Sequence, residues 1–438
     1  MKINIMRLRF TVAFAFVAGP ALAQVPAPAP AQTKPVLITG ATLHVGNGTV
    51  VPNAAVAFVQ GRLTYAGPAA GFTADRGGYE TIDATGQELY PGLILPNTTL
   101  GLTDIESVRA TVDEQEVGIL NPNVRSLIAY NTDSDVLPTL RVNGVLLAQP
   151  TPRGGLLAGQ SSVVQLDAWN WQDAVVRADE GQHLAWPPLV ARLSPAEDAP
   201  ALERRQKARE TQLRDLEQLF GEAAAYRKLP AGRRENLRLT ALAGLFDGSK
   251  TLYLHADYGK EIIEAVRFAK RLGVQKVTVV GARDAWMVLD FLKQNDVAVV
   301  VSRLHELPRR DADDYDQPYK LPAQLQAAGI RYCLDYEGKQ EAPGGRNLAF
   351  IAGTAAAFGL TKEQALTAIT QAPAQLMGID KEYGTLETGK SATLVLSTGD
   401  LLDMRTNNVT RAFIDGRSIN LETKQKALDR KFRGKYGL

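Results

Sequence analysis

The alternation of hydrophobic and polar positions divides the chain into three parts. Short β-type runs separated by turns, such as Val36–Gly40 and Ala55–Val59, fill the first part. Apolar strands then alternate with helical segments, and short β runs return near the end of the chain. Sustained strand–helix alternation is typical of a parallel sheet, and the length of this part suits a (β/α)8 TIM-type barrel. We therefore predict an α/β protein with a barrel and a small β-sandwich built from the N- and C-terminal segments.

The predicted boundaries follow these changes of pattern. Residues 36–90 and 384–420 are assigned to the composite β-sandwich, and residues 91–383 to the barrel. A long charged stretch at about 197–228 predicts a helical insertion with a solvated face, and 421–438 predicts a basic tail helix. The alternation is clearest from Thr251 onwards, in strands at 251–255, 276–280, 297–303 and 330–335.

The first 35 residues are predicted to lie outside the fold. Basic residues precede a short apolar run, Phe10–Ala18, and an Ala-x-Ala site follows it at Ala21–Ala23. This order indicates a secretory signal peptide cleaved after Ala23, with a Pro/Ala-rich tether at 24–35. No later stretch reaches the roughly 20 apolar residues of a membrane-spanning helix. We expect a periplasmic or secreted protein with no membrane partner.

Charge and cysteine content narrow the kinds of partner and of metal site that we expect. A formal net charge of +2 gives no reason to expect nucleic acid or an anionic membrane as a partner. Cys333 is the only cysteine, which excludes an intramolecular disulfide and a cysteine-based metal site. The glycine-rich segment Gly154–Ser161 lacks the Lys-Ser/Thr ending of a phosphate-binding loop, so we expect it to shape a tight turn.

The end of one predicted strand is the first candidate for a functional site. The apolar run Leu89–Leu95 is followed by Asn97 and Thr99. Residues two apart in a strand share a face, so both side chains are predicted to point the same way. A pair of metal-binding histidines would suit this placement. A neutral amide and a hydroxyl are much poorer ligands for zinc-like ions.

Three motifs resemble the amidohydrolase superfamily, in particular its imidazolonepropionase-like and Xaa-Pro dipeptidase-like members. Pro91–Ile94 resembles the start of the family's first barrel strand. Ala365–Ile379 resembles its closing helix, and Gly384–Lys390 resembles its return into the sandwich. The resemblance implies a barrel hydrolase that acts on carbon–nitrogen bonds with zinc or a similar divalent metal.

The resemblance also implies ligands that this chain lacks. Asn97 and Thr99 stand where the family has two histidines on the first strand, and Gly281 stands at its sixth-strand histidine. His255 matches the fifth-strand histidine. A catalytic zinc site needs three protein ligands. The residual candidates His255, Asn97 and Glu337 make a poor set, so we expect no metal or other cofactor unless the protein is active.

Further candidates surround this predicted pocket. Asp335 or Glu337, at the end of the last strand, could act as a general base beside His255. Glu106 follows the first strand and His305 follows the seventh, so both are candidates to line the pocket with Asn97, Thr99 and Gly281. The alternative for Glu106 is a solvated loop carboxylate. His183 is expected in a loop, as a surface or packing residue.

Three functional hypotheses follow from this sequence, and the first is favoured. The protein is a catalytically silent relative that partners an intact homologue or forms a homo-oligomer. Alternatively, it hydrolyses carbon–nitrogen bonds of an amide or dipeptide, with His255 and Glu337 or Asp335 as the acid–base pair. In the third hypothesis, it is a periplasmic protein that binds a small peptide or cyclic amide without turning it over.

Overall fold

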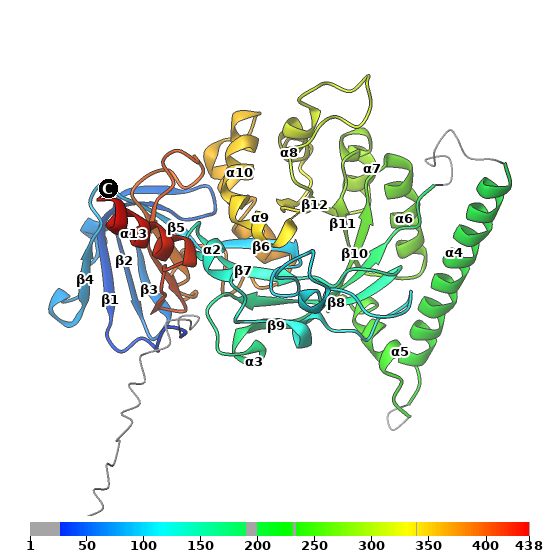
Figure 1. Ribbon diagram of the computed structural model, residues 1–438, viewed down its shortest axis with the longest axis horizontal. Helices are drawn as coiled ribbons and strands as arrows, with labels where there is room; N and C mark the ends of the chain where they lie inside the picture. Colours follow the sequence, from blue (N-terminus) through cyan, green and yellow to red (C-terminus); the bar gives the residue numbers. More distant parts are fainter. Residues whose placement is uncertain (1–26, 190–198, 231–233, 339, 438) are drawn as a thin grey trace, which may run out of the picture.

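Two β-sheets organise the molecule. The computed structural model describes residues 27–189, 199–230, 234–338 and 340–437, so the predicted signal peptide lies outside the described residues. Figure 1 shows a sheet built from N- and C-terminal strands on the left and a nearly closed barrel sheet in the centre. The predicted α/β class, with a barrel between two halves of one β unit, is confirmed.

The terminal sheet joins the two ends of the chain. Its strands follow the order β16-β15-β14-β5-β1-β2-β3, with β4 beside β1. The register pairs Leu396 of β14 with Leu89 of β5, so a C-terminal strand lies directly against an N-terminal one. All these strands belong to one hydrogen-bonded mixed sheet. Their bounds are β1 Val36–His44, β2 Val50–Val59, β3 Arg62–Pro68, β4 Glu80–Asp83, β5 Glu88–Pro91, β14 Leu394–Ser397, β15 Val409–Ile414 and β16 Arg417–Ser418.

Side-chain alternation in β1 gives this sheet two apolar faces. Val36 and Ile38 pack into one core, whereas Leu37 packs into another with Ala55. The β2–β3 hairpin turns at Gln60 and Gly61, with φ angles of 49° and 80°. Positive φ at both positions is the geometry of the tight two-residue turns that favour glycine.

The barrel sheet follows the order β13-β12-β11-β10-β9-β8-β7-β6. Its strands are β6 Leu93–Thr98, β7 Val145–Pro150, β8 Leu157–Gln165, β9 Val175–Ala185, β10 Thr251–Ala256, β11 Lys276–Gly281, β12 Ala298–Val301 and β13 Tyr332–Leu334. β8 runs antiparallel to both neighbours, unlike the all-parallel strands of a regular (β/α)8 barrel. The physical reason is the short connection 151–156, which permits a hairpin but not the long crossover of a parallel pair.

A segment before α12 closes the gap between the first and last barrel strands. The backbone N–H of Ile94 in β6 donates to Ile369 O at 3.0 Å, and that of Leu334 in β13 donates to Ala368 O at 3.1 Å. These bonds satisfy backbone groups that an open sheet edge would leave unpaired. The barrel is therefore closed by this segment rather than by a direct β6–β13 pair.

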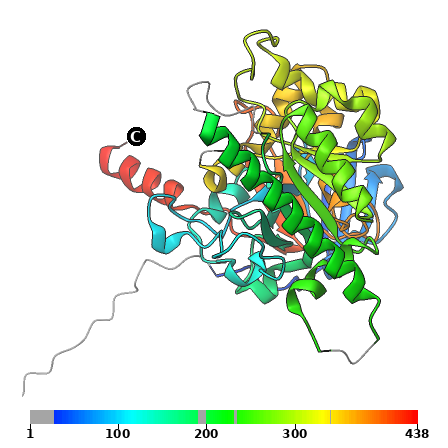
Figure 2. The same cartoon turned by 90° about the vertical axis from the view of Figure 1, so that its right-hand side faces the viewer.

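Helices cover the barrel unevenly. The longest, α4 (Ala199–Arg227), lies across the face turned to the viewer in Figure 2. In α6, Ile262, Val266 and Ala269 repeat at three- and four-residue spacing and are buried against the sheet. None of the helices within the described ranges is both long and apolar enough to cross a membrane. The remaining α-helices are α1 Ser126–Ala129, α2 Leu137–Arg141, α3 Trp171–Ala174, α5 Leu237–Leu242, α6 Gly259–Arg271, α7 Leu289–Gln294, α8 Gln317–Ala328, α9 Glu341–Gly344, α10 Leu348–Ala357, α11 Lys362–Thr367, α12 Gln371–Leu376 and α13 Lys424–Tyr436.

His44 connects the terminal sheet to a barrel helix. Its Nε2 lies 2.9 Å from Glu88 of β5, and its Nδ1 lies 2.7 Å from Glu363 of α11. The ring also stacks on Tyr90, with centroids 4.4 Å apart. Burial opposes protonation of His44, but the two carboxylates outweigh it and raise its pKa above the ordinary 6.5.

Replacing His44 with glutamine is expected to destabilise the protein more at pH 6 than at pH 8. Because the pKa of His44 is raised on folding, its contribution is full below about 6.5 and is lost as pH rises through the folded-state value. Urea unfolding of both proteins across this range measures the difference. The exposed histidine variant His305→Gln serves as the control, and an equal destabilisation at both pH values would contradict the prediction.

Candidate functional site

The end of strand β6 is distorted where the first ligand would be expected. Asn97 has a φ of 46°, in the left-handed region that asparagine tolerates better than most residues. Its backbone N–H donates to Gln149 Oε1 at 2.8 Å, and its carbonyl accepts from Arg153 Nη2 at 2.9 Å. Thr99 follows the strand, and its N–H donates to Glu341 Oε1 at 2.9 Å. The regular strand geometry that the sequence predicts for this pair is therefore interrupted at Asn97.

The Asn97 side chain bridges a cation and two acids. Its Oδ1 accepts from Arg153 Nη1 at 2.8 Å, and its Nδ2 donates to Asp335 Oδ2 at 2.8 Å and reaches Glu337 Oε2 at 3.4 Å. A guanidinium can only donate, so Arg153 fixes which end of the amide is oxygen. The amide therefore turns its N–H groups, and not a lone pair, toward the carboxylates of the last strand.

Arg153 is the residue at the centre of this site that the sequence reasoning did not find. Its guanidinium also donates to Glu341 Oε1 at 2.6 Å. Burial would lower the pKa of Arg153, but the charges of Glu341, Glu337 and Asp335 raise it, so the side chain stays cationic. The available signal was an arginine directly before Gly154, in the turn after the second barrel strand.

Two of the acids near Arg153, Asp335 and Glu341, have raised pKa values. Burial, followed by the charge of Glu337, raises the pKa of Asp335 well above its usual range, although the hydrogen bond from Asn97 opposes this. Burial also raises the pKa of Glu341 to about 7, against the attraction of Arg153. The guanidinium is thus the main compensation for negative charge at the barrel mouth.

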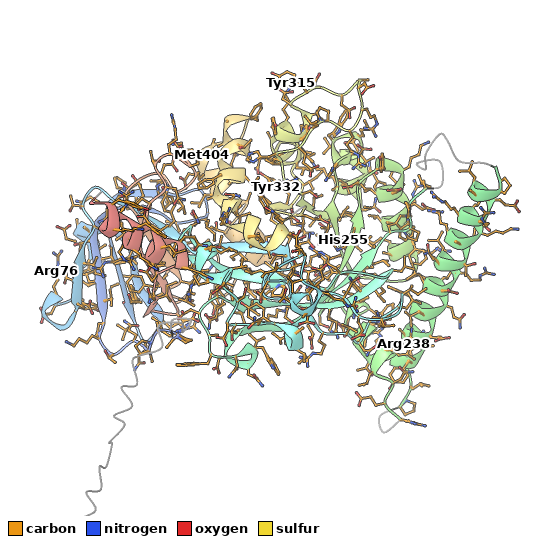
Figure 3. The ribbon with its side chains drawn as sticks, in the orientation of Figure 1. Arg76, Arg238, His255, Tyr315, Tyr332 and Met404 are labelled. Atoms are coloured by element: carbon orange, nitrogen blue, oxygen red, sulfur yellow. The ribbon has the colours of Figure 1, made fainter. Side chains whose placement is uncertain are left out.

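His255 and His183 lie side by side on β10 and β9. His255 Nε2 is 2.9 Å from His183 Nδ1, and the His183 ring stacks on Tyr253 with centroids 4.6 Å apart. The expectation that His183 lies in a loop is wrong, because it is in β9 and only 1% exposed. Figure 3 places His255 in the barrel, far from the terminal sheet where Arg76 lies. Burial and the charge of Arg153 lower the pKa of His255 to about 3, so it is neutral near pH 7.

The comparisons with known proteins match this architecture. The sequence model of the amidohydrolase family matches residues 316–419, which include the last barrel strand and the return into the terminal sheet. An amidohydrolase from Thermotoga maritima MSB8 superposes with a TM-score of 0.75 at 21% identity, over 87% of this chain and 99% of that one. Residues 316–419 thus match the amidohydrolase family, and the likeness of the whole chain to the solved structure concerns the fold.

Two further relatives show how far this likeness extends. A Xaa-Pro dipeptidase structure with bound methionine in its active site superposes with a TM-score of 0.51 at 13% identity, over 88% of this chain and 99% of that one. Adenine deaminase 3 of Rhizobium meliloti (strain 1021) is 29% identical over 160 residues, which are 35% of this chain and 26% of that protein. The chain thus spans about a quarter of this curated relative, and the likeness to the dipeptidase concerns the fold alone.

The remaining predicted pocket residues are Gly281, His305 and Glu106. Gly281 ends β11 with a φ of 89°, and a Cβ there would lie 2.6 Å from Asp257 Oδ1. A histidine at this position would be strained by the positive φ and would require Asp257 to move. His305 bonds to Thr354 at 2.7 Å, and Glu106 is exposed on the loop after β6. In the described ranges, neither of these two is hydrogen-bonded to Asn97, Arg153 or His255.

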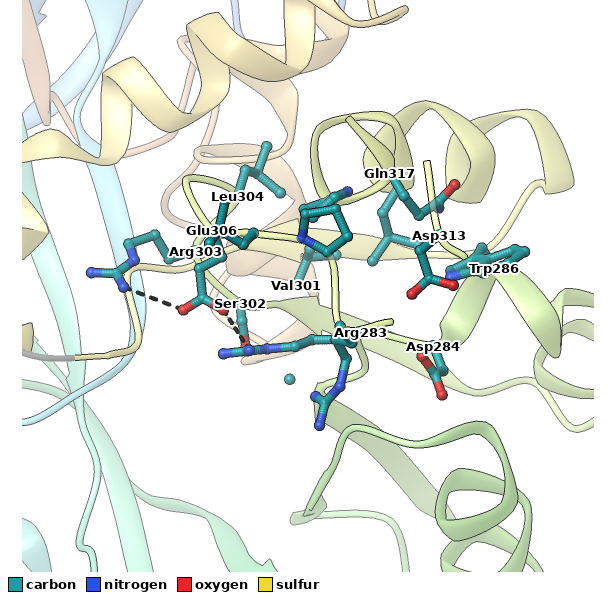
Figure 4. Close-up of a pocket in the computed structure, with 16 residues that line it drawn as sticks. Arg283, Asp284, Trp286, Val301, Ser302, Arg303, Leu304, Glu306, Asp313 and Gln317 are labelled. Atoms are coloured by element: carbon teal, nitrogen blue, oxygen red, sulfur yellow. Dashed lines mark hydrogen bonds and ion pairs between the residues drawn. The ribbon is translucent and has the colours of Figure 1, made fainter. Parts of the chain in front are cut away.

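A side pocket opens next to the mouth of the barrel. Figure 4 shows Arg283 and Arg303 both pairing with Glu306 there. Ser302 lines the pocket, and its Oγ lies 3.4 Å from Glu337 Oε2, which connects the pocket to the acids beneath Arg153. The pocket is small and lies beside the site rather than forming a separate centre.

The residues at the mouth do not fit the divalent metal of the superfamily. Among the described residues, no three His, Cys, Asp or Glu side chains cluster as a metal site. The carboxylates that would be ligands already face the guanidinium of Arg153 and the N–H groups of Asn97. A divalent cation would meet the positive charge of Arg153 and the N–H groups of Asn97 there. These groups therefore make the residual candidates a poor set of metal ligands.

Proposed function

We propose that this protein is silent in metal-dependent hydrolysis of carbon–nitrogen bonds and serves as the partner of an intact homologue. The position of Arg153 supports this most directly. Its guanidinium contacts both oxygens of Asn97 and the carboxylate of Glu341. A protein cation thus compensates the acids that a catalytic metal would otherwise bind, at the end of the barrel where function resides.

The titratable groups proposed as an acid–base pair, His255 with Asp335 or Glu337, are poorly suited to hydrolysis without a metal. A general base works best when its pKa lies near the operating pH. The pKa of His255 is about 3, which makes its imidazole a weak base at neutral pH. Asp335 has a raised pKa and gives its oxygens to Asn97 and to the N–H of Glu337. Hydrolysis by His255 with Asp335 or Glu337 is therefore the second candidate, and ligand binding without turnover in the side pocket is the third.

The proposed setting is the periplasm or the extracellular space. The order of basic, apolar and Ala-x-Ala segments before Gln24 supports export. An exported barrel without a working centre has a use if it stabilises or regulates a sibling that retains the His-x-His motif. A homo-oligomer is the alternative assembly.

The test combines metal content, activity and co-purification. We expect the purified mature chain to bind clearly less than one zinc or manganese per molecule. No hydrolysis of an Xaa-Pro dipeptide, adenine or a cyclic amide is expected above background. Near-stoichiometric metal, with hydrolysis abolished by His255→Ala but retained by His305→Ala, would overturn the proposal. The partner role requires co-purification with a sibling that carries His-x-His, and recovery of a homo-oligomer alone would count against it.

A further inference from the structure

A line of hydrogen bonds runs beneath the barrel mouth from β8 to β10. Ser161 Oγ bonds to Glu180 and lies 2.9 Å from His183 Nε2. His183 Nδ1 in turn lies 2.9 Å from His255 Nε2. Glu180, Ser161 and His183 are buried, whereas His255 is partly exposed. These contacts form a relay that ends at the one histidine facing the mouth.

Fixed donors determine the charge at the inner end of the relay. The backbone N–H of Asn97 donates to Gln149 Oε1, which identifies that end of the amide as the oxygen. The other end, Nε2, therefore faces Glu180 and donates to it at 2.5 Å. Tyr253 donates to the other oxygen of Glu180 at 3.0 Å, and Ser161 is the third donor. Burial raises the pKa of Glu180, but these three hydrogen bonds oppose the shift and stabilise the carboxylate.

The direction of every later bond follows from that carboxylate. Ser161 has one proton, which it donates to Glu180, so its oxygen must accept from His183 Nε2–H. A neutral imidazole carries only one N–H, so Nδ1 of His183 is an acceptor. The bond between the two rings is then donated by His255 Nε2–H. The remaining nitrogen of His255, Nδ1, is left without a proton.

We propose that Glu180, Ser161 and His183 are positioning residues that hold His255 in its Nε2–H tautomer and present Nδ1 as a hydrogen-bond acceptor at the mouth. The hydrogen bond that the His255 ring makes to the described residues uses Nε2. The positive charge of Arg153 acts on both histidines and opposes the addition of a second proton to either ring. The mouth therefore suits a small uncharged molecule that offers an N–H or O–H group, such as an amide or an alcohol. This assignment stands whether or not the protein hydrolyses its ligand.

If the hydrogen bonds of the relay ran in the opposite direction, His255 would have the other tautomer. A protonated Glu180 would donate to Ser161, which would donate to His183 Nε2. Both histidines would then carry the proton on Nδ1, and the mouth would present a donor instead of an acceptor. Because the two directions put opposite tautomers on His255, a single spectrum separates them.

Long-range proton–nitrogen NMR of the nitrogen-15-labelled mature chain is the test. The sequence has 4 histidines, so His→Gln variants assign each ring. We expect His183 and His255 both to show protonated Nε2 and unprotonated Nδ1 at pH 7. Protonated Nδ1 on His255, or a charged ring, would overturn the proposal. His44→Gln and His305→Gln, which lie outside the relay, identify two of the rings. The other two rings are expected to share one tautomer, so the test does not require any relay variant to fold.

A pair of neighbouring serine variants tests whether the relay is responsible. Ser161→Ala removes the acceptor of His183 Nε2–H, so the tautomer of His255 is expected to shift toward Nδ1–H. Ser162→Ala is the matched control, since Ser162 is equally buried on β8 but accepts from Asp179 N–H outside the relay. A His255 spectrum unchanged in folded Ser161→Ala, or changed equally in both variants, would remove the assigned roles.

Discussion

Replacing Arg153 with methionine is expected to lower the free energy of unfolding by about 3–5 kcal/mol at pH 7, because removing one partner leaves buried acids without their counter-charge. Glu341 loses its only guanidinium, and Asn97 loses the donors to both of its oxygens. Methionine replaces most of the aliphatic stem of arginine without its charge, so the change tests charge more than volume. Urea unfolding of the mature chain measures the difference.

The pH dependence identifies the cause. Folding raises the pKa values of Asp335 and Glu341, so their ionisation reduces stability as pH rises through the folded-state values. Without Arg153 these pKa values rise further, and the deficit is therefore expected to be larger at pH 8 than at pH 5. The control Arg331→Met breaks an exposed pair with Asp296 and should change stability by no more than about 0.5 kcal/mol. A deficit independent of pH would contradict the proposed role of the acids.

Replacing Asp167 with alanine is expected to cost about 3–5 kcal/mol as well, at a site far from the mouth. Asp167 accepts from Arg141 at 2.5 Å, from Arg417 at 3.0 Å and from the backbone N–H of Ala29 at 2.9 Å. It is therefore a single buried anion that ties α2 of the barrel to the N-terminal segment and to β16. The variant leaves the buried guanidinium of Arg141 without a carboxylate.

Urea unfolding of two further variants, Asp135→Ala and Asp167→Asn, provides the comparison for Asp167→Ala. Asp135→Ala removes an exposed carboxylate that pairs with Lys424, and this change should lie within about 0.5 kcal/mol. Asp167→Asn is expected to fall between the two, because the amide oxygen still accepts one hydrogen bond but carries no charge. A loss below about 1 kcal/mol for Asp167→Ala would show that the contacts of Asp167 with Arg141, Arg417 and Ala29 contribute little to the stability of the folded state.

Much of the architecture followed from local patterns. Apolar runs alternating with amphipathic helices, as in Thr251–Asp335, depend only on which side chains avoid water, and this pattern predicts the barrel directly. The direction of β8 did not follow from such a pattern. An apolar strand has the same pattern whether it runs parallel or antiparallel, and the decisive feature was the length of the 151–156 connection.

The candidate site also has one part that the sequence determined and another that only the structure showed. The sequence by itself determined that Asn97, Thr99 and Gly281 cannot supply the imidazoles of a metal centre, because ligand chemistry is fixed by residue type. Only the tertiary structure decided what replaces those imidazoles. Arg153 meets Glu341 across 188 positions of sequence, and Asn97 meets Asp335 across 238. Such partners are brought together by barrel closure, since charge and hydrogen-bond complementarity between distant residues leaves no local pattern in the sequence.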